Sequence, residues 1–274
     1  MIADYHMHLV DDDHPYTDAD FTTERVAAYV AAAATAGVDE ICFTDHVHRF
    51  RQARDWFDHP LWVADAVEDL TRYHATVTAA RDAGLPVRVG LEVEYLEGSE
   101  ERIRQTLDGY AWDMLLGSVH WVSGLAVDWD AAPVWEMHAV ADVWRMYVDA
   151  VCAAAASGIY DVMAHPDLAK VFGHRPEPKP FALYEQMADA FQAAGVCAEV
   201  STAGYRRPLG EIYPDPDLLR MFRARGVPVT LASDAHSPGG VGLRFGDAVS
   251  VLTTAGYRTI TLFRSREPRQ EPLG

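Results

Sequence analysis

Met1-Ile-Ala-Asp-Tyr-His6-Met-His8 opens the chain with a short apolar run that ends in two histidines. Four further apolar runs end in a similar way, with Thr44-Asp-His46, Gly117-Ser-Val-His120, Ala164-His165 and Ser233-Asp-Ala-His236. A histidine that only filled a core could fall anywhere along an apolar face, whereas these fall at the ends of the runs. The pattern is typical of a barrel that gathers its functional residues at strand ends, and it favours a polynuclear metal site.

A second pattern shows what separates these runs. Six times, a helical stretch ends in a glycine that is followed by a β-rich apolar segment. These glycines are Gly37, Gly84, Gly158, Gly195, Gly226 and Gly256. Glycine suits the left-handed position that ends a helix because it has no Cβ. Helices that alternate with buried strands predict βαβ units and a parallel sheet.

The spacing of the strands predicts the architecture. About eight strand candidates lie roughly 25 to 45 residues apart, as a (β/α) barrel requires. The candidates are residues 2–5, 40–43, 87–89, 114–119, 161–163, 196–200, 229–231 and 259–262. We therefore expect an α/β fold and a single barrel domain over residues 1–274. One long helix is expected over residues 62–83, and the charged segment 264–274 is expected to be a frayed tail.

The composition disfavours several classes of function. The chain has 274 residues, of which 49% are hydrophobic, and 23 basic against 41 acidic residues give a net charge of −18. Nucleic-acid binding depends on releasing counterions to basic side chains, so a nucleic-acid partner is not expected, whereas a small phosphorylated substrate remains possible. We find no apolar segment that would span a membrane and no signal-peptide pattern. The three cysteines match no disulfide or zinc spacing, and a reduced, cytoplasmic enzyme is expected.

The groups at the strand ends form a candidate ligand set. His6 and His8 are two residues apart on one strand, so their side chains point the same way. The predicted metal ligands are His6, His8, His14, His46, Glu92, His120, His165, Asp234 and His236. For two of these ligands the sequence also offers an alternative residue. Glu94 shares a strand face with Glu92, and one of the aspartates at 11–13 could take the place of His14.

The chemistry of these donor groups limits which metal ions could bind. Imidazole and carboxylate donors without thiolate suit zinc, manganese or iron. Two or three such divalent ions would lower the pKa of bound water toward neutrality and offset the charge of a phosphoryl group. They would therefore support hydrolysis of a phosphate ester by hydroxide, without a covalent intermediate. Asp4 and Asp45, which adjoin ligand histidines in the sequence, could orient imidazole rings.

Several of these motifs together resemble a known family. His6-Met-His8, Gly90-Leu-Glu92-Val-Glu94-Tyr95, Gly117-Ser-Val-His120-Trp and Ser233-Asp234-Ala-His236-Ser-Pro are similar to motifs of the PHP (polymerase and histidinol phosphatase) superfamily. Residues 199–214 resemble its histidinol-phosphate phosphatase branch in particular. The resemblance implies a distorted (β/α)7-type barrel with a metal site at the C-terminal ends of the strands.

The resemblance also implies roles for individual residues. A first metal would be held by His6, His8, Glu92 and Asp234, a second by Glu92, His120 and His165, and a third by His14, His46 and His236. The implied catalytic residues are Asp234, His236 and Glu92. The implied phosphate-binding residues are Arg206, Arg207 and Lys170. Lys170 stands where an arginine is expected, and it offers a point charge rather than a two-pronged donor.

The activity implied by the resemblance is metal-dependent hydrolysis of L-histidinol phosphate. Another small phosphate monoester, or a cyclic phosphodiester, is the alternative substrate. An amidohydrolase is disfavoured because neither of the two lysines, Lys170 and Lys179, is placed to serve as a carboxylated ligand on the fourth strand. An accessory domain of a DNA polymerase is disfavoured by the acidic charge and the complete ligand set.

Overall fold

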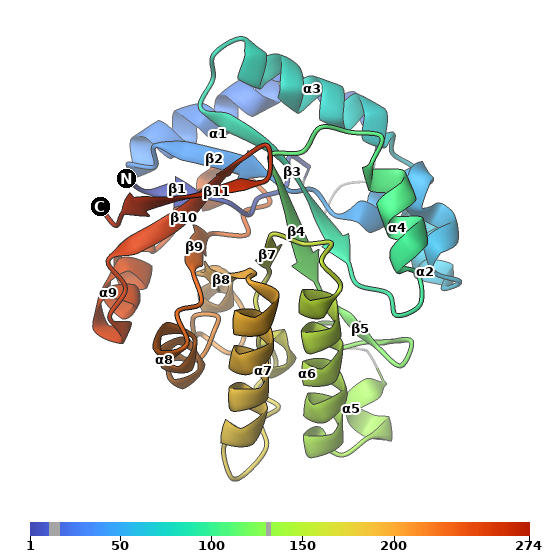
Figure 1. Cartoon of the computed structure of the whole chain (residues 1–274). Helices are drawn as coiled ribbons and strands as arrows, with labels where there is room; N and C mark the ends of the chain where they lie inside the picture. The colour runs from blue at the N-terminus through green and yellow to red at the C-terminus, as the bar shows by residue number, and fades with distance from the viewer. Residues whose placement is uncertain (11–16, 130–132) are drawn as a thin grey trace.

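The computed structural model describes residues 1–10, 17–129 and 133–274, and Figure 1 shows a parallel sheet with helices packed around its outside. The sheet has seven strands in the order β1-β2-β3-β4-β7-β8-β9. They are β1 (Ala3–Asp4), β2 (Glu40–Phe43), β3 (Val87–Glu94), β4 (Met114–Ser118), β7 (Val162–Met163), β8 (Cys197–Ser201) and β9 (Val229–Ala232). Every neighbouring pair is parallel.

The sheet curves round so that its first and last strands meet. The Tyr5 backbone N–H donates to the Leu231 carbonyl at 2.9 Å, and the Asp234 N–H donates to the His6 carbonyl at 2.8 Å. A parallel bridge between Met7 and Ala235 continues this seam beyond the named strands. The result is a seven-stranded (β/α) barrel, which confirms the predicted fold class.

The helices follow the strands as the glycine pattern predicts. The main helices are α1 (Thr23–Ala36), α3 (Leu70–Asp82), α4 (Glu100–Leu107), α6 (Val140–Ala156), α7 (Phe181–Ala194), α8 (Pro216–Ala224) and α9 (Phe245–Ala255). The Thr22 hydroxyl caps α1 by accepting from the Arg25 N–H at 3.2 Å, and Gly37 ends the helix at φ 74°. A short α5 (Val134–Met137) precedes α6.

The long helix expected over residues 62–83 is instead two helices, α2 (Pro60–Asp65) and α3. The break follows from local polar contacts. The Asp69 carboxylate caps α3 through the Thr71 N–H at 2.8 Å. The neighbouring Glu68 turns inward to a buried two-pronged ion pair with Arg49, at 3.0 and 3.1 Å.

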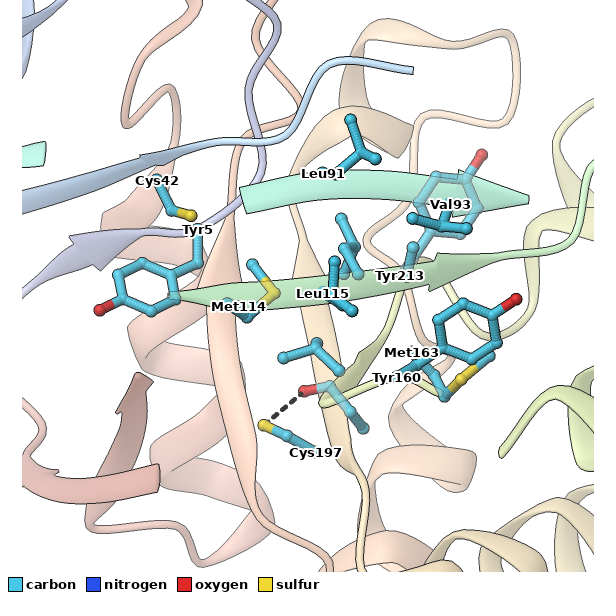
Figure 2. Packing of buried hydrophobic residues seen from close by; sticks show 14 of the residues in the cluster. Tyr5, Cys42, Leu91, Val93, Met114, Leu115, Tyr160, Met163, Cys197 and Tyr213 are labelled. Atoms are coloured by element: carbon cyan, nitrogen blue, oxygen red, sulfur yellow. Dashed lines mark hydrogen bonds between the residues drawn. The ribbon is translucent and has the colours of Figure 1, made fainter. Parts of the chain in front are cut away.

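Figure 2 shows a cluster of buried hydrophobic residues packed around β3 and β4. Leu91 and Val93 on β3 and Met114 and Leu115 on β4 are fully or almost fully buried. Gly117 on β4 is required by packing, since a Cβ there would lie 2.5 Å from Cγ of Tyr160. Close packing of this kind keeps the strand ends in fixed positions.

The tail is ordered, so the expectation of fraying is wrong. The eighth strand candidate, β10 (Thr259–Arg264), pairs antiparallel with β11 (Glu267–Pro272) and lies outside the parallel sheet. Ser265 and Arg266 form the turn between them, at φ 50° and 65°. The hairpin is held because Arg266 binds Asp161 at 3.0 Å and the Ser265 N–H donates to Asp113 at 3.1 Å. In the part of the chain described, no helix has both the length and the apolar character needed to cross a membrane.

Candidate metal centre

The carboxyl ends of the strands bring histidines and carboxylates to one place. Nε2 of His6 lies 3.1 Å from Nε2 of His8, and His8 Nε2 lies 3.2 Å from Oδ1 of Asp234. The rings of His46 and His236 both stack against His8, with centroids 4.1 and 4.2 Å away, and their own centroids are 5.9 Å apart. These side chains come from residues up to 230 positions apart in the chain, and the barrel closure joins them.

Three groups of donor atoms are compact enough to hold a metal ion. Within each group the candidate ligand atoms lie within 4.8 Å of one another. The groups are His6, His8 and Asp234; His6, Glu92 and His165; and His8, His46 and His236. Shared members place the three groups side by side, so the geometry suits a polynuclear centre.

Glu92 lies at the middle of this arrangement. Its carboxylate is 2.5 Å from His46 Nδ1, 3.5 Å from His6 Nε2 and 3.3 Å from His165 Nε2. It also lies 3.6 Å from His120 Nε2. A carboxylate that contacts four imidazoles from different strands is placed to bridge two ions.

Glu94 has a different position from Glu92, although both lie on one face of β3. Its carboxylate contacts Nδ1 of His120 at 2.6 Å and accepts from the backbone N–H of His120 at 2.8 Å. It therefore fixes the ring of His120 from behind and leaves Nε2 facing Glu92. Of the two alternatives left open by the sequence, Glu92 has the geometry of the bridging ligand.

Glu199 on β8 is an orienting residue to which the sequence reasoning assigned no role. It is fully buried, its Oε2 lies 2.7 Å from His6 Nδ1, and its Oε1 accepts from the His165 N–H at 3.1 Å. A carboxylate behind a ligand imidazole fixes its tautomer and raises its basicity. The feature of the sequence that could have indicated this role is an acidic residue near the end of an apolar strand.

Asp4 and Asp45 do not orient imidazole rings. The Asp4 carboxylate accepts from the backbone N–H groups of Ser233 and Gly242, at 2.8 and 3.0 Å. Asp45 accepts from the Leu9 N–H at 2.9 Å. Both aspartates anchor the loops that carry the ligands, and among the described residues neither carboxylate contacts an imidazole, so the structure does not support the role suggested by their place in the sequence.

The backbone is strained at two of these positions. Asp234 adopts φ 53° and His165 adopts φ 23°, in the region that non-glycine residues rarely occupy. Such conformations cluster at functional sites, where the surrounding structure enforces them. At Asp234 the enforcing group is Arg206, whose Nη2 donates to the Ser233 carbonyl at 2.8 Å and the Asp234 carbonyl at 2.7 Å.

At Glu92 and His8 the electrostatics favour the protonation states that bind metal. Burial raises the pKa of Glu92, but His46 and His6 outweigh it and hold the pKa of this carboxyl well below its ordinary value. Burial together with His46 and His236 holds the pKa of His8 well below its ordinary value. A carboxylate and a neutral imidazole are the forms that ligate a divalent ion.

The donor set fits a divalent metal. It consists of imidazole nitrogens and carboxylate oxygens, as zinc, manganese and iron accept. Nδ1 of His165 is buried with no hydrogen-bond partner among the described residues, while its Nε2 faces Glu92. The carboxylates of Glu92 and Asp234 contact imidazoles rather than cationic side chains in their ion pairs.

Comparison with known proteins identifies the family to which this site belongs. The model of the PHP domain matches residues 4–203, which is most of the chain and includes β1 to β8. The chain belongs to the PHP domain family. This membership confirms the resemblance drawn from the histidine motifs.

Relatives of this PHP domain are similar over nearly their whole length. A probable histidinol-phosphatase of Deinococcus radiodurans is 39% identical over 243 residues, covering 87% of this chain and 90% of that protein. A histidinol-phosphatase of Bacillus subtilis is 25% identical and covers 82% of this chain and 91% of its own. The crystal structure of the histidinol phosphate phosphatase of Lactococcus lactis, complexed with zinc, L-histidinol and phosphate, has a TM-score of 0.78 at 21% identity and covers 98% of both chains.

The PHP site opens into a small cavity of about 80 Å³. Several predicted ligands line it, namely His46, Glu92, His120, His165, Asp234 and His236. Asp128, Arg207 and Tyr213 line it as well, and of these only Arg207 was predicted from the sequence. His14 was also predicted as a ligand, but it lies outside the described residues.

Two of the three residues predicted to bind phosphate are engaged elsewhere. Lys170 is fully buried, with its Nζ 2.7 Å from Asp167 and 2.8 Å from the Ile212 carbonyl, so the expectation that it binds phosphate is wrong. A buried ammonium needs such partners, because an unpaired charge inside a protein is costly. Arg206 braces the Asp234 backbone as described above. Arg207 therefore is the predicted phosphate ligand that faces the cavity.

Proposed function

We propose that this PHP domain hydrolyses L-histidinol phosphate to L-histidinol and inorganic phosphate as a metal-dependent phosphomonoesterase. The observation that carries the proposal is the 39% identity, over 87% of the chain, to a probable histidinol-phosphatase, combined with the cluster of metal-competent groups at the strand ends. The L. lactis enzyme of the same fold, seen with zinc, L-histidinol and phosphate, supports the same substrate and cofactor.

The proposed ligands are those predicted from the motifs. His6, His8, Glu92 and Asp234 would hold one ion, and Glu92 with His120 and His165 a second. His46 and His236 would hold a third with His14. When bound, two or three divalent ions supply a nucleophilic water at neutral pH and offset the negative charge of the phosphoryl group. Zinc, manganese and iron all suit these donors.

Side chains of this protein hold the proposed ligands in position. Glu199 holds the ring of His6, and Glu94 holds the ring of His120, so that Nε2 of each faces Glu92. Arg206 holds Asp234 in its strained conformation through two carbonyl groups. We assign the catalytic contacts to Glu92, Asp234 and His236, which face the cavity at its metal-ligand wall.

The other wall of the cavity suits a phosphate. Arg207 supplies a cationic donor there. Tyr213 is buried, its hydroxyl has no hydrogen-bond partner among the described residues, and burial and the neighbouring Asp167 raise its pKa. A hydroxyl that keeps its proton can donate to a phosphoryl oxygen. We propose that Arg207 and Tyr213 bind the phosphate.

The proposal extends to where the enzyme works. We expect a cytoplasmic protein that acts on a small phosphorylated metabolite and has no nucleic-acid partner. Fractionation of the native cells, followed by immunodetection, would check the location, and DNA binding at physiological salt would check the second point.

Phosphate release from L-histidinol phosphate, measured beside a panel of small phosphate esters and a cyclic phosphodiester, tests the substrate. Elemental analysis of the same preparation counts the metals. We expect two or three metals per chain and a preference for L-histidinol phosphate of about 100-fold or more. A flat profile with metals present would reject the substrate and favour another small ester, while retaining the metal-dependent hydrolysis.

A further inference from the structure

A small antiparallel hairpin interrupts the parallel barrel next to the metal centre. It consists of β5 (Trp121–Val122) and β6 (Leu125–Ala126), joined by a turn in which Ser123 and Gly124 have φ of 51° and 76°. This turn reverses the chain directly after His120. The Val127 N–H then donates to the His120 carbonyl at 2.9 Å, so the returning strand lies beside the ligand histidine.

The hairpin delivers Asp128 to the cavity. Asp128 is half-buried and lines the cavity together with His120, Arg207 and Tyr213. Within the described ranges, no hydrogen bond or ion pair engages the Asp128 side chain.

A carboxylate in this position is unfavourable for a phosphate ester alone. A phosphate monoester carries a negative charge, and a second negative charge in the same small cavity repels it. Asp128 therefore requires a positive partner in the complex. It belongs to none of the three metal-competent groups found among the described residues, and Arg207 serves the phosphate under the proposed function.

The remaining positive partner is on the substrate. L-histidinol phosphate carries a primary ammonium on the carbon next to the CH₂–O–phosphate group, so its positive and negative ends are only a few bonds apart. The cavity offers the complementary pair, with Arg207 and Tyr213 for the phosphate and Asp128 for a cation. We propose that Asp128 is a specificity residue that binds the ammonium group of the substrate, an inference that rests on the proposed function.

The test compares two substrates that differ only in the ammonium. One is L-histidinol phosphate, and the other is its deaminated analogue, 3-(imidazol-4-yl)propyl phosphate. Both are assayed with the wild-type holoenzyme, with Asp128→Asn and with a control, Glu97→Gln. Glu97 is an exposed acid on the same side of the barrel that does not line the cavity, so the control removes a negative charge without touching the site.

We expect wild-type enzyme to prefer the aminated ester by about 10- to 100-fold in kcat/KM, the usual value of a charge-assisted hydrogen bond. Asp128→Asn should lose this preference mainly through a higher KM, turn over the analogue within about twofold of wild type and keep its metals. Glu97→Gln should keep the preference. The product L-histidinol should also inhibit the variant more weakly than the wild type.

Three results would overturn the role of Asp128. They are a wild-type preference near one, a preference that survives in Asp128→Asn, and a loss of metal in that variant, which would make Asp128 a metal ligand. The proposed function has a separate point of failure. It is rejected if the wild type hydrolyses other esters of the panel as fast as L-histidinol phosphate, whatever the variant does.

Discussion

The two ends of the barrel use acidic residues in opposite ways. At the carboxyl ends of the strands, Glu92 and Asp234 meet only imidazoles in their ion pairs. At the amino ends, Asp113 and Asp161 are paired with arginines and accept backbone hydrogen bonds, from Val89 at 3.0 Å and from Leu115 at 2.8 Å. One end keeps its carboxylates available for a metal, and the other uses them to hold the chain together.

The difference indicates which end of the barrel contributes most to the stability of the fold. In (β/α) barrels the carboxyl face carries function, while the amino face contributes mainly to stability. Here the β10–β11 hairpin lies across the amino face (Figure 1). Its turn residue Arg266 binds Asp161 at 3.0 Å. The ligand face contains the two strained residues Asp234 and His165. Substitutions at the two ends should therefore separate activity from stability.

The largest expected effect is the loss of the charge on Asp234. Asp234→Asn keeps the side-chain size and tolerates the positive φ, but it removes a carboxylate that lies 3.2 Å from His8. We expect metal content to fall and kcat/KM to drop by about 1000-fold or more. The free energy of unfolding of the metal-free protein should stay within about 1 kcal/mol of wild type.

Elemental analysis, steady-state kinetics and urea unfolding of both metal-free proteins check this prediction. Chelation of the wild type should produce the same loss of activity, and added metal should restore the wild type only. Full activity in metal-free Asp234→Asn would show that the carboxyl face does not depend on a metal.

The next effect concerns a residue that acts through a ligand. Glu199→Gln leaves the imidazole of His6 without its charged partner at 2.7 Å. Loss of such a partner typically weakens metal affinity or activity by about 10- to 100-fold. We expect a weaker affinity for metal and a partial recovery of activity at high metal concentration.

Metal titration of the metal-free protein, followed by activity, checks the role of Glu199. Glu185→Gln, at an exposed position on α7, is the matched control and should titrate like the wild type. If saturating metal restores nothing, Glu199 has a role other than positioning His6.

The cluster of candidate ligands could be predicted from the sequence because its signal is local. His6, His46 and His120 each lie within a few residues of the end of an apolar run, and a strand end is recognisable from its neighbouring residues. The (β/α) barrel was predictable for the same reason, since the βα units carry a glycine and an apolar segment, although this pattern gave about eight strands and the number seven came from the family resemblance. The placement of these residues at strand ends therefore depends little on distant parts of the chain.

The misses share a dependence on distant contacts. Lys170 is removed from the cavity by Asp167 and by the Ile212 carbonyl, and Ile212 is 42 residues away. Asp128 lines the cavity beside Arg207 and Tyr213, which are far from it in the sequence. The tail is ordered because Arg266 meets Asp161 across 105 positions. No local pattern encodes such pairings.

A smaller effect distinguishes the two arginines near the ligand face. Arg207→Ala removes the cation from the cavity wall and should raise KM for L-histidinol phosphate by about 10-fold or more with metal content unchanged. Arg206→Ala instead frees the Ser233 and Asp234 carbonyls. It should lower kcat more than it raises KM, because Asp234 loses its support.

Kinetics of the two variants over a range of substrate concentrations would check this difference. A higher KM with unchanged kcat in Arg206→Ala would place Arg206, rather than its neighbour, on the phosphate. Unchanged kinetics in Arg207→Ala would remove Arg207 from the site.

The smallest effect is at the opposite end of the barrel and should spare activity altogether. Arg266→Asn keeps a residue that tolerates φ 65° but removes the guanidinium that binds Asp161 and the Ile159 carbonyl. Because Arg266 is 40% exposed, the expected loss is only about 1 kcal/mol of unfolding free energy. Arg269→Ala, on the same hairpin but with a side chain that is 62% exposed, should change stability by less than about 0.5 kcal/mol. Urea unfolding compares the two, and kcat/KM should stay within about twofold of wild type in both. A loss of activity in Arg266→Asn without loss of stability would mean that the amino end of the barrel also controls the site. Among the described residues, no hydrogen bond or ion pair of the hairpin reaches a residue of the cavity, so such an effect would have to travel through the strands.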